Sequence, residues 1–267
     1  MAERTVIVEA YTGFAEVYDT FMDNVPYEEW AEYLHQTLEK YDISDGLVLD
    51  LGCGTGTLTE LFSGYGYDMI GVDNAEDMLD IAMEKRVESG SDILYLLQDM
   101  REFELYGTVR AIVSVCDSVN YITDPQELLQ VFRLVNNYLD PKGIFIFDFN
   151  TEYKYKEILG DNTIAEERPE CSFIWDNYYY ADEKINEYEL TLFIRDDELS
   201  EECGQDICVK FQETHFQRAY TLIEIKDLLE QAGMEFVDAF EAFTENDAEE
   251  ISERICVIAR ECGKQLI

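Results

Sequence analysis

Five short apolar runs alternate with segments of helical periodicity in the middle of this 267-residue chain. Buried runs separated by amphipathic helices are typical of parallel βαβ units, with helices covering both faces of one sheet. The runs lie at 47–51, 69–72, 93–97, 111–115 and 144–149, and the amphipathic segments lie near 57–63, 75–88 and 125–138. The pattern predicts an α/β fold with a Rossmann-like, doubly wound sheet.

The residue pattern differs on both sides of this core. Before it, aromatic side chains from Tyr11 to Met22 fall on one face of a predicted helix, and Pro26 starts a second helix. After it come three stretches rich in aromatic and β-branched residues, separated by a plausible turn and by an acidic loop at 196–205. Such stretches favour an antiparallel sheet. They lie at 172–180, 184–195 and 206–218.

The helical period returns at 222–232 and stops at Gly233, and two last strands are expected near 234–241 and 254–260. We therefore expect two parts. One is a core formed by 1–150 and 219–267. The other is an inserted β lid, or substrate subdomain, formed by 151–218.

The net charge of the chain limits the substrates and partners that it can bind. The chain has 19 basic and 59 acidic residues, a formal net charge of -40. Proteins grip phosphate backbones with Lys and Arg, so a field this negative argues against a nucleic-acid substrate. It fits a solvated surface, or a preference for a cationic substrate. No apolar run approaches the length of a membrane span, and we expect a cytoplasmic protein.

The seven cysteines are scattered, and a reducing compartment suits them as free thiols. Cys203 and Cys208 leave open a loop disulfide or half of a metal site. The chain has only two histidines, so we expect no metal.

The stretch VLDLGCGTG, residues 48–56, places a glycine-rich turn after the first apolar run. A dinucleotide site requires G-x-G-x-x-G, but the third glycine position here is Thr57. Asp50, just before the turn, would oppose a pyrophosphate and suits a ligand that carries an ammonium group. Asp73 ends the second run, where a carboxylate can accept both hydroxyls of a ribose. A nicotinamide dehydrogenase is therefore disfavoured.

This turn, followed by GVDNAEDML at 71–79 and LLQDM at 96–100, resembles the class I S-adenosylmethionine-dependent methyltransferases. The flanking stretches, with CDSVNYI after the fourth run, resemble a bacterial small-molecule type that carries an antiparallel lid. The resemblance implies a seven-stranded sheet whose last strand is antiparallel, with S-adenosyl-L-methionine as cofactor. The cofactor-binding residues that it implies are Tyr11, Asp50, Gly52, Cys53, Gly54, Asp73, Asn74, Met78, Asp99, Met100 and Cys116.

The predicted function is methyl transfer to a small-molecule acceptor, with an amine as one acceptor class, by a monomer or homodimer. An amine must also lose a proton, which requires a base or an escape route. Related sugar N-methyltransferases carry a histidine where this chain has Tyr121. The candidates for the base are Tyr121, Tyr11, His215 and Asp148. Two alternatives stay open: a non-catalytic protein that binds S-adenosylmethionine, and a methyltransferase of a basic protein.

Overall fold

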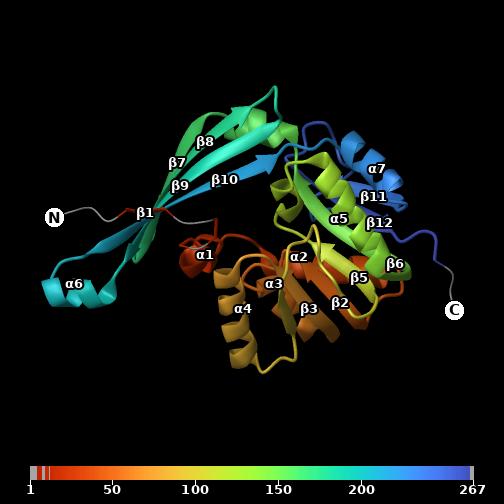
Figure 1. Ribbon diagram of the computed structural model, residues 1–267, viewed down its shortest axis with the longest axis horizontal. Coiled ribbons are helices and arrows are strands. Elements are labelled where there is room, and N and C mark those ends of the chain that lie inside the picture. The colour runs from red at the N-terminus through yellow and green to blue at the C-terminus, as the bar shows by residue number, and fades with distance from the viewer. Residues whose placement is uncertain (1–4, 8–9, 12, 265–267) are drawn as a thin grey trace.

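The computed structural model describes residues 5–7, 10–11 and 13–264 (Figure 1). The outermost residues of the predicted core, 1–4 and 265–267, lie outside the described residues. Among the residues that are described, no helix is long and apolar enough to cross a membrane.

A seven-stranded sheet forms the core, as predicted, with the strand order β11-β12-β6-β5-β2-β3-β4. The last strand in sequence, β12, is antiparallel to both of its neighbours, while β2, β3, β4, β5 and β6 run parallel. The strands are β2 (Gly46–Leu51), β3 (Tyr67–Asp73), β4 (Leu94–Leu97), β5 (Val109–Ser114), β6 (Leu139–Asn150), β11 (Glu235–Glu241) and β12 (Arg254–Arg260).

Helices cover both faces of this sheet. One face packs against α5 (Pro125–Tyr138) and α7 (Leu222–Gln231), and the other against α2 (Tyr27–Glu39) and α3 (Thr57–Gly64), with α4 (Glu76–Ser89) beside α3. Capping explains where two of them begin. Asp124 accepts the N–H of Gln126 ahead of α5, and Thr221 and Glu224 form a capping box at the start of α7.

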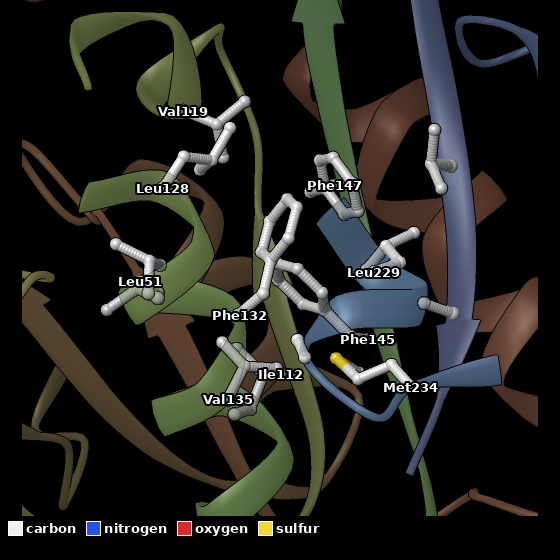
Figure 2. Close-up of a cluster of buried hydrophobic side chains, with 14 of the residues drawn as sticks. Leu51, Ile112, Val119, Leu128, Phe132, Val135, Phe145, Phe147, Leu229 and Met234 are labelled. Carbon is white, nitrogen blue, oxygen red and sulfur yellow. The ribbon is translucent and has the colours of Figure 1, made fainter. Parts of the chain in front are cut away.

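The larger apolar cluster lies between the sheet and the pair α5 and α7 (Figure 2). Phe132 of α5 packs against Phe145 and Phe147 of β6, whose rings stack with centroids 4.6 Å apart. All three side chains are fully buried. This packing fixes the carboxyl ends of the parallel strands, where ligands bind in such sheets.

A second sheet has the order β1-β10-β9-β8-β7. The three predicted stretches form antiparallel strands, but β7 was not predicted, and the edge strand β1 comes from the N-terminus and pairs in parallel with β10. In Figure 1 this sheet extends away from the core. The strands are β1 (Thr5–Ile7), β7 (Asn162–Glu167), β8 (Cys171–Tyr180), β9 (Ile185–Arg195) and β10 (Cys208–Arg218).

The expected loop at 196–205 contains a short helix, α6 (Asp197–Cys203). Asp196 caps it by accepting the N–H of Leu199, and Gly204 ends it in the left-handed conformation. A single π-helical turn, η2 (Lys154–Leu159), follows β6. All seven cysteines are free thiols, so no disulfide joins Cys203 to Cys208.

The N-terminal helix is shorter than predicted. It is α1 (Ala15–Phe21), and Tyr11 precedes it with a φ of 65°. The prediction that Tyr11 lies on the helical face is therefore wrong, because the chain turns before the helix begins. Val17 and Phe21 of α1 pack against the inner face of the second sheet.

Candidate active site

The glycine turn lies directly after β2 and bends the chain through three positive φ angles, at Gly52 (82°), Gly54 (52°) and Gly56 (73°). A Cβ atom at Gly52 would lie 2.8 Å from the Cβ of Ser118, whereas one at Gly54 would meet nothing within 4 Å. The backbone at Gly54 therefore borders open space. Glycine at these positions lets a ligand approach the main chain closely.

Two carboxylates flank this turn, that of Asp50 buried and that of Asp73 half-buried. Asp73 accepts the N–H of Gly54 at 2.8 Å and the N–H of Ala75 at 2.9 Å. Asp50 accepts the hydroxyl of Thr59 at 2.6 Å. Burial raises the pKa of Asp73, and burial raises the pKa of Asp50 to about 7. Among the described residues neither carboxylate forms a salt bridge, so a cationic ligand group would supply the missing counter-charge.

A cavity of about 600 Å³ opens at the carboxyl ends of the parallel strands. Its volume is that of a small-molecule site. Every predicted cofactor residue lines it: Tyr11, Asp50, Gly52, Cys53, Gly54, Asp73, Asn74, Met78, Asp99, Met100 and Cys116. Within this set, the carboxylate of Asp99 is engaged by Arg101, whose hydrogen bonds lower the pKa of Asp99.

Tyrosines form part of the wall of the cavity. Tyr11, Tyr18, Tyr27 and Tyr121 all line it, and each is half-buried. Tyr121 lies at the end of the short 3₁₀ turn η1 (Ser118–Tyr121), which follows β5. Tyr18 and Tyr27 lie on the predicted helical faces, and their position at the cavity comes from the structure.

Three of the four candidates for the base lie together. The hydroxyl of Tyr11 donates to that of Tyr121 at 2.6 Å, and Nδ1 of His215 lies 3.1 Å from the same Tyr121 oxygen. His215 itself is buried behind the cavity wall. Asp148 lies elsewhere: it is fully buried, and it binds Arg254 at 2.8 Å and the N–H of Asp117 at 2.8 Å.

Two further members of this cluster were missed by the sequence analysis. The hydroxyl of Tyr188 lies 2.7 Å from that of Tyr121, and Glu213 contacts Nε2 of His215 at 3.2 Å. A signal for Glu213 exists in the sequence. Polar residues recur at every second position of β10, at Glu213, His215 and Gln217, and all three are buried.

Comparison with known proteins agrees with this geometry. Residues 48–143 match the model of the methyltransferase domain family. The chain is 32% identical over 246 residues to YqeM of Bacillus subtilis, a protein assigned to the methyltransferases, and the match covers 92% of this chain and 94% of that protein.

A solved structure with the same fold is an S-adenosylmethionine-dependent methyltransferase from Clostridium acetobutylicum. It is 28% identical, with a TM-score of 0.84, covering 95% of this chain and 99% of that one. Similarity also extends over 136 residues, at 31% identity, to an N,N-dimethyltransferase of a dTDP-linked 3-amino sugar from Streptomyces venezuelae. That match covers 50% of this chain and 56% of that enzyme.

Proposed function

Because the chain belongs to the S-adenosylmethionine-dependent methyltransferases, we propose that it transfers a methyl group to the nitrogen of a small amine. S-adenosylmethionine is the cofactor of this family. The acceptor class is the part that this proposal adds.

The cavity residues fit this cofactor. S-adenosylmethionine carries an α-ammonium group and a sulfonium, and the two uncompensated carboxylates Asp50 and Asp73 suit a cationic ligand. In the proposal Asp73 accepts the ribose hydroxyls, and Gly52 and Gly54 admit the methionyl and ribose parts to the backbone. Asp50 orders the turn through Thr59. Asn74, Met78, Asp99 and Met100 border the adenosine, and Cys53 and Cys116 line the methionyl side.

The observation that carries the acceptor class is the tyrosine wall of the cavity. The space next to Tyr11, Tyr18 and Tyr121 is bounded by α1, and α1 itself packs under the second sheet. A walled space of this kind suits a small molecule better than a macromolecular chain. We propose that 151–218 acts as the lid that selects this acceptor.

Three further observations support an amine. Aromatic faces attract cations, so the tyrosine wall suits both a sulfonium and an ammonium. The net charge of -40 favours the approach of a cationic acceptor. The similar protein from Streptomyces venezuelae acts on an amino sugar. Tyr121, Tyr11 and His215 supply a hydrogen-bonded route by which the proton of the amine could leave.

The experiment is a transfer assay with S-adenosylmethionine labelled in its methyl group. Matched pairs of small amines and the corresponding alcohols, amino sugars among them, are offered as acceptors. The proposal expects label in amines and not in their hydroxyl counterparts, and an Asp73→Ala control should reduce it. Label that enters only alcohols, or only a basic protein such as a histone, would contradict the proposed acceptor.

A further inference from the structure

The side chain of Glu213 is completely buried behind the cavity wall, in contact with His215. We propose that Glu213 is a positioning residue that fixes the tautomer of His215, so that a proton can pass from the acceptor through Tyr121 to His215. This inference rests on the proposed transfer to nitrogen.

The contacts of Glu213 determine which ring nitrogen of His215 carries the hydrogen. Its carboxylate accepts the backbone N–H of Tyr11 at 2.7 Å and that of Phe14 at 2.8 Å. Nε2 of His215 lies 3.2 Å from the oxygen that binds Tyr11. An ionised carboxylate can only accept hydrogen bonds, so Nε2 must carry the hydrogen. A neutral His215 then has its lone pair on Nδ1.

The donor and acceptor in each of the other hydrogen bonds follow from this tautomer of His215. With a lone pair on Nδ1, the hydroxyl of Tyr121 donates to His215 across 3.1 Å. The oxygen of Tyr121 has then used its only hydrogen, so it accepts from its other partners. Those partners are the hydroxyls of Tyr11 at 2.6 Å and Tyr188 at 2.7 Å. One chain of hydrogen bonds therefore leads from the cavity wall to Glu213.

Methyl transfer to an amine requires a path by which a proton leaves the acceptor. Transfer from bound S-adenosylmethionine forms an N–C bond and breaks the S–C bond, leaves the electron pair on sulfur, and frees one proton from the amine. The proton passes to the oxygen of Tyr11, which lines the cavity and gives its own hydrogen to Tyr121, and Tyr121 gives its hydrogen to Nδ1 of His215. Burial raises the pKa of Tyr121 well above its ordinary value, so a lasting phenolate is disfavoured and the imidazole is the better resting place.

The surroundings of His215 stabilise the imidazolium that results. Glu213 binds it on one side, and the ring of Tyr188 stacks on it with centroids 4.5 Å apart and planes 7° apart. Tyr11 approaches edge-on at 5.1 Å. Among the described residues, the ionisable groups that face His215 are these two tyrosines, Tyr121 and Glu213, and none is a cation. A charged imidazole is therefore paired and not repelled.

Glu213 also ties the relay to the N-terminal part of the chain. The same carboxylate holds Tyr11 and Phe14, which lie 202 and 199 residues away in sequence. The alignment of the relay thus depends on the main chain at Tyr11 and Phe14. If Glu213 served only to anchor the N-terminal main chain, it would form the same two hydrogen bonds, but replacing it would not change the tautomer of His215.

The test is the tautomer itself, read by long-range ¹H–¹⁵N correlation of the imidazoles in ¹⁵N-labelled protein at pH 8, with S-adenosylhomocysteine added. The chain has two histidines, and a His35→Gln variant identifies the signals of His215. We expect the Nε2–H tautomer in the wild type. Glu213→Gln should move the tautomer ratio toward Nδ1–H by about tenfold, or about 1.4 kcal/mol. Tyr121→Phe should keep the tautomer but remove the hydrogen-bond shift at Nδ1.

Glu189→Gln is the matched control, because it removes the same charge from the exposed face of the neighbouring strand. It should leave the spectrum unchanged. An Nδ1–H tautomer in the wild type would overturn the inference even if Glu213→Gln fails to fold, and so would an unchanged ratio in a folded Glu213→Gln variant. Transfer of label to oxygen alone would refute the proposed acceptor without altering the tautomer result, so the two failures are distinguishable.

Discussion

Lys85 of α4 donates a hydrogen bond to the carboxylate of Asp19 in α1 at 2.6 Å. The same ammonium donates to Thr57 at 2.7 Å, and Asp19 accepts the hydroxyl of Thr55 at 2.7 Å. The glycine turn and the helix that carries Tyr18 are thereby joined through one ion pair. This pair ties α1 to the glycine turn, which we propose contacts the cofactor.

Replacing Lys85 by Met should therefore weaken S-adenosylmethionine binding. The pair is partly exposed, so its contribution is at most about 1 kcal/mol, which corresponds to roughly fivefold in affinity. Calorimetry measures the change. Lys40→Met is the control, since Lys40 belongs to an exposed ion pair with Glu245. Equal effects of the two substitutions would show that α1 is not held in this way.

Cofactor affinity should depend on pH below neutrality. The pKa of Asp50 is raised to about 7 and that of Asp73 is also raised, because both carboxyls are desolvated without a cation. A cationic ligand favours the ionised form, so binding near pH 6 releases protons and affinity rises from pH 5.5 to 7.5. Calorimetry in two buffers of different ionisation enthalpy counts these protons. Affinity that is flat across this range would refute the electrostatic account.

The stability of the ligand-free protein should have the opposite trend. The folded pKa of Asp50 lies above its unfolded value of about 3.9. Its contribution is therefore fully present below about pH 4 and is lost as the pH rises through about 7. An Asp50→Asn variant should remove this dependence and be more stable than the wild type at pH 8. Denaturant titrations at pH 5 and pH 8 check it, and a destabilised variant at pH 8 would contradict the prediction.

Phe147 tests the packing that places the strand ends (Figure 2). The side chain is fully buried against Phe132 and Phe145, so Phe147→Ala should lower the free energy of unfolding by about 3–5 kcal/mol. Val87→Ala, on the exposed side of α4, should change it by less than about 0.5 kcal/mol. Urea titration measures both, and a small effect at Phe147 would mean that the core is packed differently.

The core and the residues that line the cavity could be predicted because their causes are local. A parallel strand covered on both faces requires an apolar run, and the turn after β2 requires glycine at its positive φ angles. Asp73 likewise ends a buried strand, as its place in the sequence indicated. These features depend on neighbours within a few residues, so they leave a periodic signal.

The parts that escaped prediction depend on distant contacts or on unusual composition. The aromatic period continued back to Tyr11, but Gly13 packs against Phe211 of β10 and the helix begins only at Ala15. The three-residue strand β1 forms because β10 offers it an edge. The acidic segment 196–205 resembled a loop, although Asp196 and Gly204 provide both ends of a helix. Nothing local showed that Glu213 would reach Tyr11.

The central claim is that Asp73 and the glycine turn hold S-adenosylmethionine, and calorimetry of the Asp73→Ala variant tests it most directly. Loss of charge-assisted hydrogen bonds worth about 1.5–3 kcal/mol should weaken binding by roughly ten- to a hundredfold. Asp68→Ala, at the exposed start of the same strand, is the control and should bind like the wild type, and NAD should bind to none of the three. Unchanged affinity in a folded Asp73→Ala protein would contradict the account.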